Sequence, residues 1–208
     1  MVEVKRVEDR IISLRIIVGK DIINIISAYA PQVGAEAHIK EKFWEDMEEL
    51  IQSIPLVEKV FIGRDFNGHV GKEAGPHARA HGGFGFGVLN NEGQSIIDFS
   101  LAYNFKIVNT CFKKREEHLI TYKSGAASIQ IEFFLVRNSD RRLCTNCKVI
   151  PKDGVTVQHR VLILDVNIKW VKHKRRQVLN PRVRWWQLKE EKREIFKRTL
   201  LEEGEWKL

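Results

Sequence analysis

The sequence has only three cysteines, Cys111, Cys144 and Cys147, among its 208 residues, and an odd number of thiols cannot pair completely. A disulfide scaffold is therefore not expected, and the thiols should stay reduced. No stretch approaches the roughly 20 apolar residues that span a bilayer. The opening residues, MVEVKRVEDR, also lack the apolar core of a signal peptide. These absences predict an intracellular protein that has no membrane segment.

Acidic residues are scarce towards the C-terminal end. Residues 169–208 hold 13 of the 35 Lys and Arg but only 6 of the 27 Asp and Glu, so they carry +7 of the net charge of +8. We therefore expect a globular domain over residues 1–168, followed by a basic linker and a helix over residues 169–208. Such a segment can bind nucleic acid, although it can also be a solvated helix face. The run KHKRR at 172–176 could equally be a nuclear address, a phosphate contact or a linker.

The spacing of apolar residues predicts more strands than helices. Helical periodicity covers residues 35–54, 91–104 and about 185–201, whereas the glycines of HGGFGFG, at 81–87, predict a loop. Strands are expected at residues 10–18, 21–29, 59–63, 106–110, 119–123, 129–137, 147–151 and 160–168. Because the helices are separate insertions among the strands, the fold class predicted is an α+β sheet sandwich.

Polar side chains stand where several of these strands begin or end. Tyr29 closes one strand, Asp65 and Asn67 follow another, Glu132 interrupts an apolar run, and His159 precedes the last strand. If the strand ends converge, they supply a carboxylate for a divalent metal, an amide for a phosphate oxygen, and a His paired with a second carboxylate. That combination suits phosphodiester hydrolysis.

Each of these residues also has a structural interpretation. An Asp-Phe-Asn-Gly stretch after a strand is often only a turn, since Asn and Gly accept left-handed backbone angles. A lone His beside a strand is usually structural. Glu132 is harder to explain in this way, because an unpaired buried carboxylate costs several kcal/mol. It needs a partner, and His159 is the natural candidate.

Motifs in one characteristic order cover nearly the whole chain, among them SAYAPQ, FIGRDFNGHVG, HGGFGFG, NNEGQSIIDFSLAYNFKIVNT, IQIEFFLVR and VQHRVLILD. In order and spacing they resemble the endonuclease domains of RTE-type retrotransposons of the BovB kind, which belong to the endonuclease/exonuclease/phosphatase superfamily. The resemblance implies a four-layer α/β/β/α sandwich of the DNase I-like type. It also implies DNA as the partner, and cleavage that depends on Mg²⁺ or Mn²⁺.

The resemblance assigns roles to the residues at the strand ends. Tyr29 matches the tyrosine that contacts the scissile phosphate, and Asn67 matches the phosphate-binding asparagine. Asp65 matches the aspartate that positions the attacking water or protonates the leaving oxygen. His159 matches the catalytic histidine, and Glu132 stands where the family has an Asp that orients it.

The implied metal ligands are Asp65, Glu132 and Gln158, and two of them depart from the family pattern. Glu132 keeps the charge but adds a methylene, and misplacing a catalytic group by roughly 1 Å can cost on the order of a hundredfold in rate. Gln158 stands where many members have an acidic residue, and it offers a metal no charge. Arg64 replaces a small residue and is expected to add bulk beside Asp65.

The family pattern also places its first strands, and the principal metal-binding Glu, upstream of the residue at which this chain starts. We therefore expect a partial sandwich of marginal stability and impaired cleavage. The alternatives are an inactive remnant that binds nucleic acid and a non-functional fragment. CTNC, at 144–147, has zinc-knuckle spacing, but no second Cys or His pair follows at a suitable distance, so a structural role is favoured. No obligate protein partner is evident.

Overall fold

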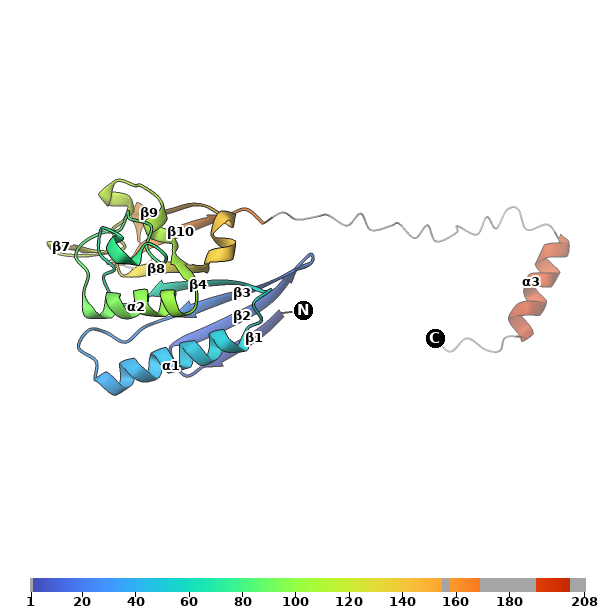
Figure 1. Ribbon diagram of the computed structural model, residues 1–208. Helices are drawn as coiled ribbons and strands as arrows, with labels where there is room; N and C mark the ends of the chain where they lie inside the picture. Colours follow the sequence, from blue (N-terminus) through green and yellow to red (C-terminus); the bar gives the residue numbers. More distant parts are fainter. Residues whose placement is uncertain (1, 155–157, 169–189, 203–208) are drawn as a thin grey trace. The chain divides into compact units, whose positions relative to one another are not determined.

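A computed structural model describes residues 2–154, 158–168 and 190–202 of the chain (Figure 1). The contacts divide the chain into two units, Met1–Val171 and Lys172–Leu208, and each is described by itself. Helix α3 (Glu190–Glu202) lies in the second unit, where the sequence predicts a helix over 185–201. The predicted basic linker lies in residues that the structure does not describe, and the predicted domain boundary at 168/169 lies where those residues begin. Both stay predictions. No helix in the described ranges is long and apolar enough to cross a membrane.

The first unit is built on a six-stranded sheet. In order across the sheet, the strands are β1 (Val2–Val7), β2 (Ile11–Val18), β3 (Asp21–Ala28), β4 (Lys59–Asp65), β8 (Glu132–Arg137) and β5 (Phe105–Ile107). All neighbours are antiparallel except β3 and β4. A parallel pair needs a crossover connection, and helix α1 (Ala37–Ser53) provides it. Strands β3 and β4 therefore end at the same edge of the sheet.

Helices α1 and α2 (Asn91–Ala102) pack against one face of this sheet (Figure 1). The helices contribute Phe43, Met47, Leu50, Ile96 and Ile97 to the core. Strand residues alternate between the two faces of a sheet, and the strands contribute Ile26, Val60, Ile62, Phe133 and Leu135 to this helical side.

The other face of the sheet packs against a second, two-stranded sheet formed by β9 (Cys144–Gly154) and β10 (Arg160–Val166). Phe61 and Val136 pack there against Leu162 and Leu164. The described layers are thus helices, large sheet and small sheet, in keeping with the predicted sandwich. The remaining short elements are β6 (Tyr122–Ser124) and β7 (Ala127–Ile129), with 3₁₀ turns η1 (Gly75–His77), η2 (Val108–Cys111), η3 (Glu116–His118) and η4 (Asn138–Leu143).

Several predicted strands differ in extent from those observed. The strand predicted at 106–110 ends at Ile107, because the chain turns into η2. The run predicted at 129–137 is two strands, β7 and β8, with Gln130 and Ile131 between them. Strand β1 was not predicted: it is an edge strand with five exposed residues out of six, and its sequence VEVKRV alternates apolar and polar residues only over the first four positions.

The two cysteines of CTNC lie in the core between the sheets. Burial raises the pKa of Cys144 to about 11 and that of Cys147 to about 12. A zinc ligand must be a thiolate, so these surroundings disfavour the zinc interpretation.

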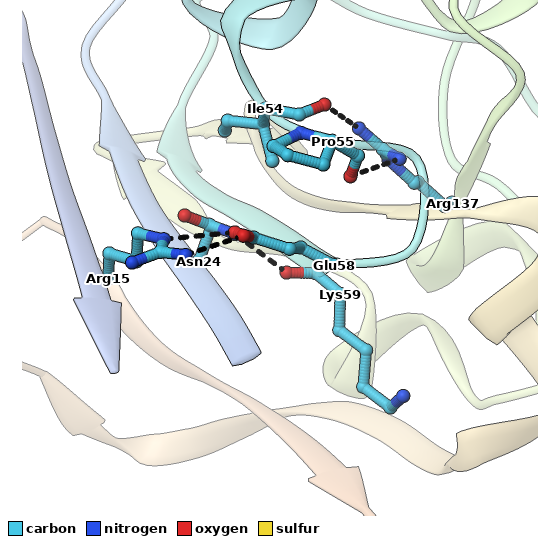
Figure 2. A network of polar contacts seen from close by, with 7 residues as sticks. All are labelled: Arg15, Asn24, Ile54, Pro55, Glu58, Lys59 and Arg137. Carbon is cyan, nitrogen blue, oxygen red and sulfur yellow. Dashed lines mark hydrogen bonds and ion pairs between the residues drawn. The ribbon is translucent and has the colours of Figure 1, made fainter. Parts of the chain in front are cut away.

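Buried charged groups connect the loop after α1 to the large sheet (Figure 2). Glu58 accepts hydrogen bonds from Arg15, at 2.6 and 3.1 Å, and from Asn24 at 2.9 Å. Arg137, at the end of β8, donates to the carbonyl oxygens of Ile54 and Pro55 at 3.1 and 3.2 Å. These contacts hold the loop that leads into β4 against the sheet, and Asp65 lies at the opposite end of that strand.

Replacing Arg137 by Met tests this connection. The variant leaves two loop carbonyls without their donor, so we expect the free energy of unfolding to fall by about 2–4 kcal/mol. Urea denaturation measures the loss. The exposed Arg142 is the matched control, and Arg142→Met should change the free energy by less than about 0.5 kcal/mol. Equal losses in the two variants would contradict the assignment.

Candidate active site

The polar residues predicted from strand ends lie at one edge of the large sheet. Tyr29 follows β3, Asp65 ends β4, and Glu132 begins β8 directly opposite Asp65 in the β4–β8 ladder. His159 immediately precedes β10 and forms an isolated bridge with Tyr122. The starts or ends of three separate strands, β4, β8 and β10, thus bring Asp65, Glu132 and His159 to one place.

Asp65, Glu132 and His159 form a close group. One side-chain ligand atom from each lies within 4.8 Å of the corresponding atoms of the other two. His159 Nδ1 makes a hydrogen bond with Glu132 Oε1. The partner that Glu132 needs is therefore His159, so the added methylene of Glu132 does not prevent the contact. The catalytic roles of these residues stay predictions.

Asn67 is tied to both Asp65 and the segment that follows β3. Its backbone N–H donates to Asp65 Oδ1 at 2.9 Å, and its side-chain Nδ2 donates to the carbonyl of Ala30 at 2.8 Å. Ala30 N in turn donates to the carbonyl of Asp65 at 2.9 Å. Asn67 has a φ of 50°, so the turn conformation expected for this stretch is present. The turn holds Asp65, Asn67 and the residue after Tyr29 as one unit.

Burial is the largest influence on the pKa of Asp65. It raises the pKa of Asp65 to about 6, and the nearby charge of Glu132 acts in the same direction. The hydrogen bond from Asn67 N and the charges of His159 and Arg64 lower that pKa in part. Within the described residues, Glu132 Oε2 is buried and has no hydrogen-bond partner. An unpaired carboxylate oxygen beside a second carboxylate is a site that favours a cation.

Tyr29 and Gln158 lie in different surroundings from this group. The guanidinium carbons of Arg64 and Arg10 lie 5.1 and 5.5 Å from the centre of the Tyr29 ring. Gln158 is exposed and donates from Nε2 to Ser124 Oγ at 3.1 Å. Its predicted role as a metal ligand stays a prediction.

Sequence reasoning missed the residues that hold Glu132 in place. Thr121 Oγ1 accepts hydrogen bonds from the backbone N–H groups of Ile131 and Glu132, at 2.9 and 3.2 Å. Asn109 Nδ2 donates to the carbonyl of Glu132 at 3.0 Å, and its Oδ1 accepts from Phe134 N at 2.8 Å. Both side chains are buried, and they bond to backbone groups that a neighbouring strand would otherwise pair with. A lone Thr or Asn in an apolar run gives no sequence signal for this function.

The fold resembles those of several solved nucleases. No family model matches the chain. The endonuclease domain of TRAS1, a telomere-specific non-LTR retrotransposon, superimposes with a TM-score of 0.60 at 11% identity, covering 81% of this chain and 70% of that one. The 3'-5' exonuclease NExo from Neisseria meningitidis gives 0.56 at 11% identity, with the same coverage. The AP endonuclease LMAP from Leishmania major gives 0.56 at 10% identity, covering 77% of this chain and 55% of that one.

The chain therefore has the DNase I-like fold of the endonuclease/exonuclease/phosphatase proteins, as the sequence motifs predicted.

In sequence the chain is similar to craniofacial development protein 2. The identity is 32% over 164 residues for the protein from Tragulus javanicus, covering 77% of this chain and 28% of that protein. For the Bos taurus protein it is 31%, with 77% and 27% covered. The chain thus spans less than a third of the length of these relatives.

The raised pKa of Asp65 predicts that an active-site substitution stabilises the fold. The pKa of Asp65 in the folded state, about 6, lies above the ordinary value near 4. Ionising this buried carboxyl therefore lowers the free energy of unfolding. The loss is absent below pH 4, grows between pH 4 and pH 6, and is complete above about pH 6. In EDTA at pH 7.5, Asp65→Asn should therefore unfold with a free energy about 2–3 kcal/mol higher than the parent chain. Urea denaturation at pH 7.5 and pH 4 should show that the gap closes at the lower pH. A variant less stable at pH 7.5 would contradict the assignment.

Proposed function

We propose that this chain carries a metal-dependent endonuclease site that hydrolyses phosphodiester bonds in DNA. The single observation that carries the proposal is the grouping of Asp65, Glu132 and His159 within 4.8 Å at the ends of separate strands. The names of the structural neighbours support it, since they are an endonuclease, an exonuclease and an AP endonuclease. A further neighbour is a 3' phosphatase bound to a product DNA hairpin.

Glu132 and His159 form the proton-handling part of the proposed site. The hydrogen bond between Glu132 and His159 Nδ1 fixes the orientation of the imidazole ring. Nε2 is then the nitrogen that exchanges a proton with the reacting phosphate or with water. Thr121 and Asn109 hold the Glu132 backbone and so limit the freedom of the pair.

Asp65 and Asn67 form the part that would position the nucleophile and the phosphate. With a pKa of about 6, Asp65 is mostly ionised at pH 7.5, and it can accept a proton from an attacking water or return one to the leaving oxygen. The amide of Asn67 is fixed by its bond to Ala30, and its second N–H is a donor suited to a phosphate oxygen.

The donor set fits a hard divalent cation such as Mg²⁺ or Mn²⁺. Asp65 offers a carboxylate, and Glu132 offers the buried oxygen that lacks a partner within the described residues. Mg²⁺ is usually held by one or two carboxylates together with substrate phosphates. A bound ion would supply Lewis-acid stabilisation of charge on the phosphate. Because Glu132 also serves His159, this ligand set is sparse, and we expect weak metal binding and slow cleavage.

A plasmid-nicking assay with Mg²⁺ or Mn²⁺ tests the proposal. We expect slow conversion of supercoiled DNA to the open-circular form, because one such site cuts one strand at a time. Asp65→Asn and His159→Gln should each lower the rate by about 10²–10⁴-fold. Arg142→Gln, in the turn η4 that follows the end of β8 farther from the site, should leave the rate unchanged. Equal nicking by the parent chain and both active-site variants would indicate a contaminating nuclease and would overturn the proposal.

A second candidate function, DNA binding without cleavage, is favoured by the charge of +7 on residues 169–208. If this segment contacts DNA, binding should weaken steeply with salt, because each neutralised phosphate releases counterions. Deleting residues 169–208 should then reduce the slope of log K against log salt by about 0.9 per lost contact. Fluorescence anisotropy in EDTA measures both slopes. An unchanged slope after the deletion would exclude the basic segment as the binding element.

A further inference from the structure

Two arginines converge on one aromatic ring beside the proposed catalytic group. Arg10 comes from the turn between β1 and β2, and Arg64 comes from β4, directly before Asp65. Their guanidinium carbons lie 5.5 and 5.1 Å from the centre of the Tyr29 ring. Arg10 also donates from Nη1 to the carbonyl of Tyr29, at 3.4 Å, and its own carbonyl accepts from Tyr29 N at 2.8 Å. Strand pairing and side-chain stacking therefore hold the three residues together.

Neither guanidinium group forms an ion pair with a carboxylate in the described part of the chain, although the charge of Arg64 acts on Asp65 beyond ion-pair distance and lowers its pKa. By contrast, Arg15 of β2, at the other end of the sheet, is paired with Glu58. Two like charges held near one ring repel each other, and an anion bound to both would relieve that repulsion. Stacking on the ring leaves the donor N–H groups, which lie in the guanidinium plane, able to bind such an anion.

The backbone of Arg64 points to the same conclusion. Arg64 has a φ of 128°, a region that residues with a side chain rarely adopt and that glycine occupies readily. The side chain is exposed, so apolar packing does not compensate for this strain. Strained residues that persist in a fold are found mainly at ligand-binding and catalytic sites. The arginine is therefore better explained by a ligand than by stability.

We propose that Arg64, together with Arg10, forms a phosphate-binding subsite on Tyr29 for a DNA backbone phosphate next to the one that is cleaved. The subsite rests on the proposed function, because it lies beside Asp65 and takes the same strand as its ligand. Guanidinium groups match the geometry of phosphate and bind it with two donors. Arg64 thus does more than add bulk beside Asp65: it places a positive charge at the ring matched to the phosphate-contacting tyrosine.

DNA binding in EDTA tests this subsite without any cleavage step. Fluorescence anisotropy of a fluorescein-labelled 20-base-pair duplex, measured from about 50 to 200 mM KCl, gives the affinity and its salt slope. Arg64→Gln should bind about 5–10-fold more weakly at the lowest salt, and its slope should fall by about 1, the value for one lost phosphate contact. Arg142→Gln removes an equally exposed arginine away from the site and should change neither quantity.

A second variant separates phosphate binding from a structural role. Arg64→Gly relieves the backbone strain, so its melting temperature should rise by about 2–8 °C while its DNA affinity falls as in Arg64→Gln. If both variants keep the parent affinity and slope, or if the parent chain does not bind the duplex, the subsite is refuted. The nicking assay tests the proposed endonuclease independently of this result. If Asp65→Asn loses nicking but Arg64→Gln binds DNA as the parent chain does, the subsite is refuted and the proposed endonuclease still stands.

Discussion

A carboxylate that is buried at the start of an apolar strand must be compensated, and here the compensation comes from an imidazole on another part of the chain. Glu132 begins β8 in the large sheet, whereas His159 precedes β10 in the small one. Their hydrogen bond therefore joins the two sheets at the edge where Asp65 ends its strand. The site exists only because the sheets are packed face to face, so the fold and the proposed chemistry depend on the same contact.

The candidate site is costly to the stability of the fold in three places. Asp65 is buried with a raised pKa, Glu132 Oε2 lacks a partner among the described residues, and Arg64 has a strained backbone. Proteins often carry such defects where a cation, a substrate or a transition state later compensates for them. The three lie within one small region, whereas the network of Arg15, Asn24 and Glu58 at the other end of the sheet is fully paired. This contrast supports a functional role for the edge of the sheet at which Asp65 and Glu132 lie.

Sequence patterns predicted the parts of this fold that depend on local periodicity. The hairpin of β2 and β3 and the helices α1 and α2 follow from the spacing of apolar residues, and their observed bounds differ from the predicted ones by only a few residues. Strand β1 was missed because the alternation in VEVKRV covers only four residues and breaks at Arg6. Predicting the candidate site also required the order of the motifs, because the sequence of each strand end does not show which strand ends lie together in the fold. Thr121 and Asn109 could not be found at all, because their contacts bring together segments distant in sequence.

The central claim is that Asp65, Glu132 and His159 form one metal-dependent hydrolytic centre. Crystals soaked in Mn²⁺ and measured at the manganese absorption edge test it most directly, because anomalous scattering locates the ion without reference to activity. The account predicts a peak within about 2.5 Å of carboxylate oxygens from Asp65 and Glu132, with His159 still bonded to Glu132. A peak elsewhere, no peak at a saturating Mn²⁺ concentration, or an imidazole turned away from Glu132 would contradict it.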